Sequence, residues 1–193
     1  MKKLPIVLDL ETKFLYRDVN YDRRKLGISV VGVYDYASDT NAAFEEHELH
    51  KLFPFLENCS YIIGFNINSF DLPILQPYYP GKLSQFPTFD LLDDIKEKLG
   101  RRLGLNDLAN ATLGKRKSGH GLQAVDLYRE GKMEELKRYC LDDVFLTKEL
   151  FEHGAEKGEI YFLNEKGKVP VKVEWKKYLQ TGGSNDTHLT LPF

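Results

Sequence analysis

Three acidic segments of this chain lie beside apolar runs that a folded protein would bury. They are Asp9–Glu11, Asn66–Asp71 and Tyr139–Asp143, and each follows or sits within such a run. A buried carboxylate is costly unless it is paired, hydrogen-bonded or bound to a cation. The fold must therefore supply partners for these acids, and four carboxylates that converge in one place would call for a metal ion.

The composition is that of an ordinary globular protein. Hydrophobic residues make up 42% and charged residues 29% of the 193 residues, which excludes the disordered and fibrous classes. The N-terminal run Ile6–Leu8 is too short for a signal peptide, and no apolar run approaches a membrane span in length. Cys59 and Cys140 stand in apolar settings, which favours reduced thiols over a disulfide. We therefore expect a cytoplasmic protein without a membrane segment.

Strand-like and helix-like patterns alternate along the chain. Strands are expected at residues 5–10, 28–36, 42–44, 61–64 and 88–89. Helices are expected at residues 48–56, 91–99, 106–113 and 133–152, with a further helix that begins at Asp71. Asp90 and Gly100 suit the N-cap and the end of the second of these helices. This alternation predicts an α/β domain.

The C-terminal part has a different pattern. Residues 160–163 and 169–175 flank a glycine-containing turn, which predicts a β-hairpin. We expect a main domain over residues 1–155, a hairpin extension over 156–180 and a flexible tail over 181–193.

The spacing of the acids favours particular side chains. In a strand, Asp9 and Glu11 point to the same face, where they could bind a hard cation. From this motif alone, a strand end that turns into solvent is the more common outcome. In a helix, Tyr139 and Asp143 share one face, whereas Asp142 points about 100° away from Asp143. The helix is therefore expected to contribute Asp143, and not Asp142, as a ligand.

A basic cluster adds to the acidic segments. Residues 96–117 contain seven basic and two acidic side chains in a chain of net charge −2. Such a cluster could bind phosphates, although spacing alone favours a solvated surface. The basic members are Lys96, Lys98, Arg101, Arg102, Lys115, Arg116 and Lys117.

Taken in order, the three acidic segments resemble the exonuclease motifs of the DEDD superfamily. The matching residues are Asp9–Glu11, the Asn-x-x-x-Phe-Asp run of Asn66–Asp71, and Tyr139 with Asp143. The chain resembles the tyrosine subtype, which includes the proofreading domain of family B DNA polymerases. It is also similar to small predicted exonuclease domains, some of them helicase-associated. The resemblance spans residues 4 to about 152 and implies a ribonuclease-H-like mixed β-sheet flanked by helices.

The resemblance also implies a reaction. Asp9, Glu11, Asp71 and Asp143 would hold two Mg²⁺ or Mn²⁺ ions, and Tyr139 would orient the attacking water. The enzyme would then be a 3′-to-5′ exonuclease that releases nucleoside 5′-monophosphates from DNA or RNA.

Further residues would hold the substrate, which the resemblance indicates to be a single-stranded 3′ end. Phe70 would stack on the terminal base, while Asn66 and the backbone near Leu10 and Thr12 would hold the nucleotide. A helicase or a polymerase is a partner to consider, although these residues contain no recognisable segment of either.

Alternatives remain open at this point. Tyr139 could be a half-buried helix aromatic and Phe70 a plain core residue. The chain could also be a nucleic-acid-binding or scaffold module of the same fold with little turnover. An inactive module usually lacks one of the four acids, and all four are present. The Tyr139 and Asp143 pair also disfavours a ribonuclease-H-like endonuclease.

Overall fold

A computed structural model of the chain describes residues 3–116 and 121–179. Lys117 of the basic cluster and the predicted tail over residues 181–193 lie outside the described residues.

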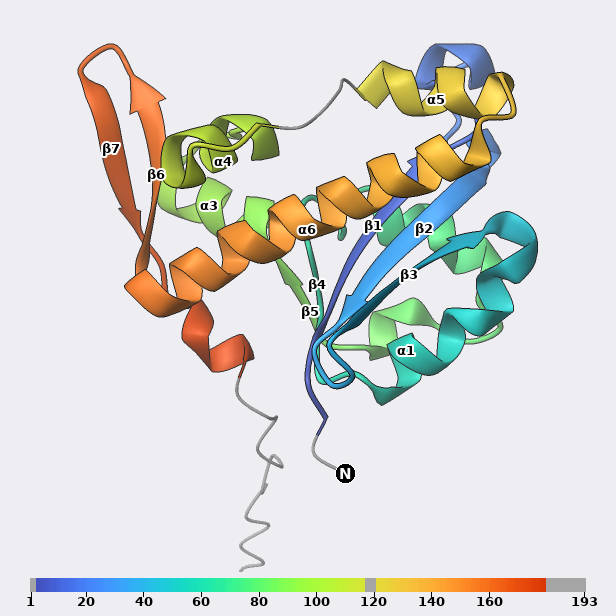
Figure 1. Cartoon of the computed structure of the whole chain (residues 1–193), viewed down its shortest axis with the longest axis horizontal. Helices are drawn as coiled ribbons and strands as arrows, with labels where there is room; N and C mark the ends of the chain where they lie inside the picture. Colours follow the sequence, from blue (N-terminus) through green and yellow to red (C-terminus); the bar gives the residue numbers. More distant parts are fainter. Residues whose placement is uncertain (1–2, 117–120, 180–193) are drawn as a thin grey trace, which may run out of the picture.

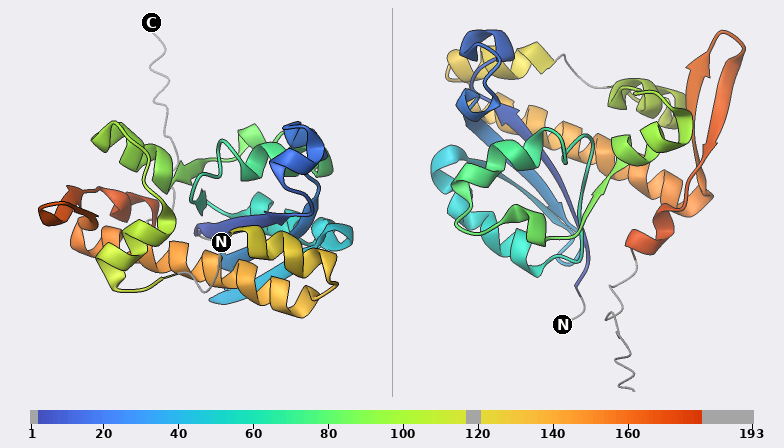
Figure 2. Two further views of the ribbon diagram at one scale, coloured as in Figure 1. Left: turned by 90° about the horizontal axis from the view of Figure 1, so that it is seen from above. Right: turned by 180° about the vertical axis from the view of Figure 1, so that it is seen from behind.

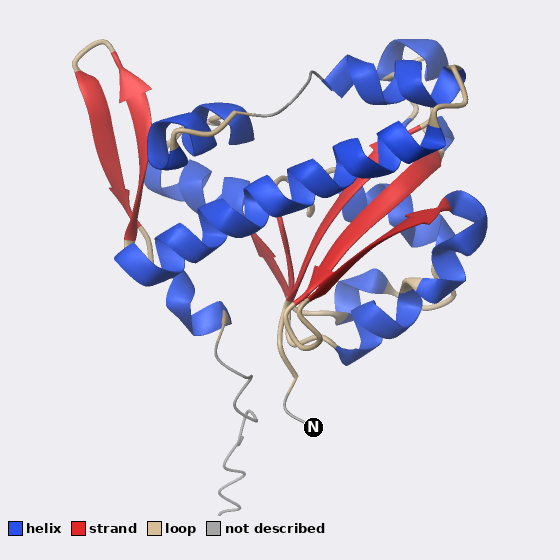
Figure 3. Ribbon diagram, viewed as in Figure 1, coloured by secondary structure: helices blue, strands red, loops and turns tan. Residues whose placement is uncertain are grey.

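A five-stranded mixed sheet forms the centre of the molecule (Figures 1 and 3). Its strand order is β3-β2-β1-β4-β5, in which β1 pairs antiparallel with β2 and parallel with β4. The β2 and β3 strands are antiparallel, and β4 and β5 are parallel. The strands are β1 (Ile6–Thr12), β2 (Ile28–Asp35), β3 (Thr40–Glu45), β4 (Ile62–Gly64) and β5 (Thr88–Asp90).

Helices cover both faces of this sheet (Figure 2). The long helix α6 crosses one face against β1 and β2, while η3, α1 and α2 cover the other. The α-helices are α1 (Phe53–Asn58), α2 (Asp71–Leu75), α3 (Leu91–Leu99), α4 (Leu105–Leu113), α5 (Gly121–Arg129) and α6 (Met133–Lys157). The 3-10 turns are η1 (Tyr16–Val19), η2 (Arg23–Lys25), η3 (Glu46–Lys51), η4 (Gln76–Tyr78), η5 (Leu83–Gln85) and η6 (Trp175–Tyr178).

The central strand β1 divides its side chains between the two faces. Leu8 and Leu10 belong to the core beneath η3, α1 and α2. Because successive side chains alternate, Asp9 and Glu11 point to the face that α6 crosses. The strand thus buries its apolar residues on one side and presents two acids on the other.

Three features differ from the sequence prediction. The helix expected at residues 48–56 is divided into η3 and α1, because Pro54 in the first turn of α1 has no N–H for the preceding turn. The helix α5 was not predicted at all. The helix α6 begins as expected but continues beyond Glu152 to Lys157, where Gly158 ends it with φ +70°.

A two-stranded hairpin follows α6, as predicted. It consists of β6 (Glu159–Asn164) and β7 (Gly167–Lys172), which are antiparallel. Side chains of both strands, together with Trp175 of η6, share one apolar core with α6. Gly154 allows this packing, because a Cβ there would lie 2.3 Å from Cε3 of Trp175. The division into a main domain and an extension stays a prediction.

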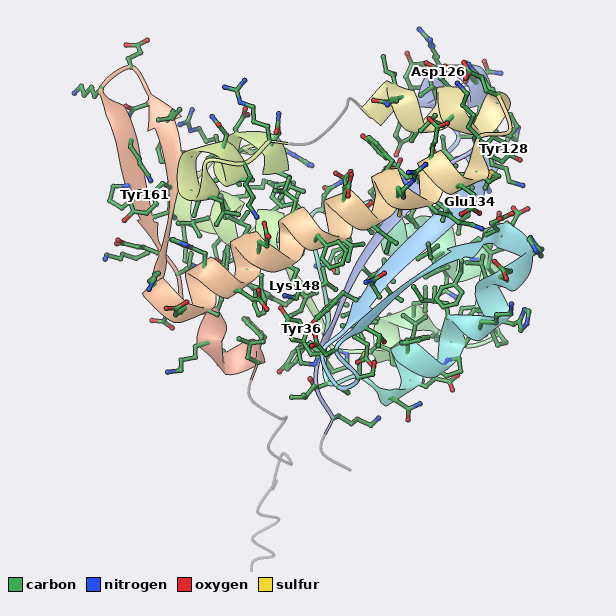
Figure 4. The ribbon with its side chains drawn as sticks, in the orientation of Figure 1. Tyr36, Asp126, Tyr128, Glu134, Lys148 and Tyr161 are labelled. Carbon is green, nitrogen blue, oxygen red and sulfur yellow. The ribbon has the colours of Figure 1, made fainter. Side chains whose placement is uncertain are left out.

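The predicted fold class is confirmed as an α/β arrangement with a mixed sheet, flanking helices and a C-terminal hairpin. Lys148 of α6 lies over two aromatic rings at the end of β2. Its Nζ is 4.6 Å from the ring centroid of Tyr34 and 5.7 Å from that of Tyr36 (Figure 4).

Among the described residues, no helix has the length and apolar character needed to cross a membrane.

Candidate active site

A cleft of about 420 Å³ opens beside β1 and α6. All nine residues that were predicted from the sequence to be catalytic, metal-binding or substrate-binding line this cleft. They are Asp9, Leu10, Glu11, Thr12, Asn66, Phe70, Asp71, Tyr139 and Asp143. The three sequence segments therefore meet in one place, while the roles of the individual residues stay predictions.

Three carboxylates form a cluster in the cleft. Asp9, Glu11 and Asp143 each place one carboxylate oxygen so that these oxygens lie within 4.8 Å of one another. Asp143 is buried on α6, whereas Asp142 is exposed, as the helical geometry predicted. Like charges this close repel one another, and a cation or a proton removes the repulsion.

A close approach of α6 to the sheet brings these acids together. Gly32 of β2 pairs with Asp9, and a Cβ at Gly32 would lie 2.9 Å from Cγ2 of Val144 and 3.0 Å from Sγ of Cys140. Cys140 is buried, and its Sγ lies 3.6 Å from the carbonyl oxygen of Asp9. The missing side chain at Gly32 therefore lets α6 lie close to β1 and β2, where Asp143 meets Asp9.

Asp71 is the fourth predicted ligand, and it lies outside the cluster of three. It begins α2, is buried and lines the same cleft. Its Oδ1 accepts a hydrogen bond of 3.0 Å from the backbone N–H of Leu10, which lies between the two acids of β1. Asp71 thus contacts the strand that carries Asp9 and Glu11.

Tyr139 lines the cleft with a buried hydroxyl. Among the described residues, its Oη has no hydrogen-bond partner. Burial, and then the nearby charges of Asp143, Glu11 and Asp9, raise the pKa of this phenol well above its usual value. The hydroxyl is therefore a neutral phenol near neutral pH. It can donate one hydrogen bond and accept others from a ligand in the cleft.

The loop that carries Asn66 is fixed by Asp90. Asp90 Oδ1 accepts from the backbone N–H of Asn66 at 2.8 Å, and its Oδ2 accepts from that of Asn68 at 3.0 Å. The same carboxylate caps α3 through the N–H of Leu92 at 2.9 Å. Burial raises the pKa of Asp90, while these backbone donors oppose the rise. The sequence identified Asp90 as a helix cap, but its hold on the Asn66 loop depends on the tertiary fold.

Several described members of the basic cluster already have partners within the protein. Lys98 pairs with Asp94 at 2.5 Å, and Lys115 pairs with Glu149 at 2.6 Å. Arg102 instead contacts a residue that lines the cleft, because its Nη2 donates to Oδ1 of Asn66 at 2.7 Å. One member of the cluster therefore contacts a predicted substrate-binding residue.

Several residues that line the cleft were not predicted from the sequence. Phe14, Leu15 and Tyr16 follow β1, and Leu122 and Val125 belong to α5. The spacing of three residues between Leu122 and Val125 is a weak helical signal that could have indicated α5.

Comparison with known protein families assigns this chain to a superfamily. The family described as the RNase_H superfamily matches residues 6–154. The chain belongs to the RNase H superfamily. This RNase H-superfamily chain has no significant match among the curated proteins.

Two solved structures share its fold. The family B DNA polymerase from the archaeon Pyrobaculum calidifontis is 19% identical, with a TM-score of 0.62 over 78% of this chain. The chain spans 24% of that polymerase. The RNase D of Trypanosoma brucei is 14% identical, with a TM-score of 0.54, and the match covers 94% of this chain and 76% of that protein. At these identities the likeness concerns the fold.

The donor set of the cleft fits a divalent metal ion. The three clustered groups are all carboxylates, and hard cations such as Mg²⁺ and Mn²⁺ prefer oxygen ligands. Asp71 adds a fourth carboxylate to the same cleft. Asp9, Glu11 and Asp143 are therefore the residues best placed to hold a cation.

Proposed function

We propose that this RNase H-superfamily chain is a metal-dependent 3′-to-5′ exonuclease of the tyrosine-subtype DEDD group. It would hydrolyse phosphodiester bonds of DNA or RNA and release nucleoside 5′-monophosphates. The observation that carries the proposal is the cluster of Asp9, Glu11 and Asp143 in a cleft that Tyr139 also lines. The sequence resemblance to the DEDD motifs and the similarity to a family B polymerase and an RNase D support it.

Each residue of the cleft has a part in this reaction. Asp9, Glu11, Asp71 and Asp143 would hold the cations, and Asp71 also accepts a hydrogen bond from the backbone N–H of Leu10. Divalent cations bound there would supply Lewis-acid chemistry, by lowering the pKa of a water molecule and neutralising charge on the departing 3′ oxygen. The Tyr139 hydroxyl orients the attacking water toward phosphorus.

Phe70 and Asn66 hold the terminal nucleotide. Phe70 lines the cleft and offers an aromatic ring to the last base, a contact that tolerates any sequence. Asn66 is held by Asp90 through its N–H and by Arg102 through its side chain. Arg102 therefore adds a positive charge beside the predicted position of the terminal nucleotide.

A single-stranded oligonucleotide labelled at its 5′ end tests the proposal. With Mg²⁺ or Mn²⁺ we expect a ladder of products that shorten from the 3′ end, and we expect chelation to stop the reaction. Asp9→Ala protein should leave the oligonucleotide intact, because it lacks one of the three clustered carboxylates. Immediate release of the labelled 5′ nucleotide without a ladder would contradict the proposal, because it would show degradation from the 5′ end. Binding without any shortening would favour the alternative of a binding or scaffold module.

Replacing Tyr139 by Phe is expected to reduce kcat by about 10²-fold, the scale on which a group that positions the reacting water acts. Cation affinity should change little, because the clustered ligands are carboxylates. Single-turnover hydrolysis and Mn²⁺ titration measure the two quantities separately. An unchanged kcat would reject the water-orienting role of Tyr139.

A further inference from the structure

A row of three aromatic rings leads out of the cleft. Phe70 lies edge-on to Tyr16, with ring centroids 6.0 Å apart and an angle of 61° between the rings. Tyr16 stacks on Tyr21, with centroids 6.5 Å apart and an angle of 18°. Phe70 and Tyr16 line the cleft, and Tyr16 and Tyr21 both belong to the connection between β1 and β2. The row therefore begins beside the acid cluster and ends at the surface.

Tyr21 is exposed and backbone-strained. Its side chain is 77% exposed, and it adopts φ +61° directly after Asn20 at φ +51°. A bulky residue at positive φ is uncommon, and an exposed ring gains little from burial to offset that cost. The backbone is held there by the N–H of Tyr21, which donates to the carbonyl of Tyr16 at 2.8 Å. Packing inside the protein thus explains the position of Tyr16 but not the presence of a large ring at position 21.

Basic side chains lie near Tyr16 and Tyr21 in the sequence. Residues 13–25 contain five basic side chains and two acidic ones. Arg24 and Lys25 both approach Asp22, at 3.0 and 3.9 Å, yet their side chains are 85% and 68% exposed. Arg23 is also exposed and makes no ion pair with any described residue. The connection therefore presents positive charge to solvent beside its exposed ring.

The neighbouring helix α5 supports this connection. Figures 1 and 2 place residues 13–27 and α5 side by side at one end of the molecule. Arg129 of α5 donates to Asp18 at 2.6 Å, and Nζ of Lys13 lies 5.7 Å from the ring centroid of Tyr128, which Figure 4 labels on α5. These contacts hold the connection at the mouth of the cleft.

We infer that the connection over residues 13–27, with Tyr21 as its outermost ring, is a platform that binds single-stranded nucleic acid upstream of the terminal nucleotide. This inference rests on the proposed function. Without bound cations the clustered acids repel a phosphate backbone, so the affinity of the metal-free protein for a strand must come from groups outside the cluster. Bases stack on the aromatic row, and Arg23, Arg24 and Lys25 contact the phosphates.

The affinity for a fluorescent single strand of about ten nucleotides tests the platform. Fluorescence anisotropy in EDTA measures binding without turnover. We expect Tyr21→Ala to weaken binding roughly tenfold and Tyr21→Phe to bind as the wild type does, because the ring and not the hydroxyl stacks. Leu163→Ala is the matched control, since Leu163 is 56% exposed on the distant hairpin and should not change the affinity.

The salt dependence of binding reports on the cations. Replacing Arg23, Arg24 and Lys25 together by glutamine should lower the slope of log affinity against log salt by roughly 0.7 for each phosphate that the variant no longer neutralises. Equal affinity of wild-type and Tyr21→Ala protein overturns the platform, as does a wild-type protein that binds no single strand. Hydrolysis of the p-nitrophenyl ester of thymidine 5′-monophosphate by the wild type reports on the acid cluster alone. Absence of that hydrolysis contradicts the proposed function, while anisotropy still decides the platform.

Discussion

Replacing Asp143 by asparagine is expected to lower the rate of phosphodiester hydrolysis by roughly 10²–10³-fold, the scale on which one lost stabilising group acts at a reacting centre. Asparagine keeps the size of the side chain but removes a negative charge from the cluster with Asp9 and Glu11. Cation affinity should fall with the rate. Wild-type protein should gain about 2.7 kcal/mol of stability at a Mn²⁺ concentration one hundred times Kd, and the variant should gain much less at the same concentration.

Asp142→Asn is the matched control, because it makes the same chemical change one residue away on the exposed side of α6. Its hydrolysis rate and its Mn²⁺-dependent melting temperature should stay near those of the wild type. In EDTA, Asp143→Asn protein should be at least as stable as the wild type, since one like-charge repulsion is removed. If both variants lost activity equally, the assignment of Asp143 as the ligand from α6 would be wrong.

Replacing Trp175 by alanine is expected to lower the free energy of unfolding by about 3–5 kcal/mol, as for other large aromatic side chains in a core. Trp175 is 1% exposed and stacks on Phe151 of α6 with ring centroids 6.1 Å apart. Its Nε1 donates to Asp94 of α3 at 2.8 Å. The variant loses both the apolar packing and this hydrogen bond, so α3, α6 and η6 all lose a shared partner.

Chemical denaturation followed by circular dichroism measures this change. Tryptophan fluorescence cannot be used, because Trp175 is the only tryptophan in the sequence and the variant lacks it. Leu163→Ala, at an exposed position on the hairpin that precedes η6, should leave the unfolding midpoint nearly unchanged. A single shifted transition would indicate that the C-terminal extension unfolds together with the sheet. An unchanged midpoint in Trp175→Ala would contradict that coupling.

The sequence predicted well the features that depend on neighbouring residues. The helix α3 has the predicted bounds, because Asp90 caps its start and Gly100 ends it in the left-handed conformation. The common face of Asp9 and Glu11, and the choice of Asp143 over Asp142, follow from the periods of a strand and a helix. Local geometry was enough in these cases.

Features that depend on distant contacts could not be predicted in the same way. The separation of Asp71 from the cluster of three is set by where α2 begins relative to β1, and a motif contains no such distance. Phe14 and Tyr16 line the cleft because α5 and the β1–β2 connection meet, although α5 itself was missed. The apolar residues of α5 belong to none of the three motifs. Their place in the cleft is therefore known only from the tertiary fold.

The crossing of α6 over β1 also determines when this site can exist during synthesis. The acids of β1 leave the ribosome well before Asp143, because more than a hundred residues separate Asp143 from them. Contacts between residues so far apart in sequence form late, since the loop entropy must be lost before they stabilise anything. A nascent chain that ends before α6 therefore has no complete acid cluster. Closure of the core and completion of the acid cluster are then one folding event.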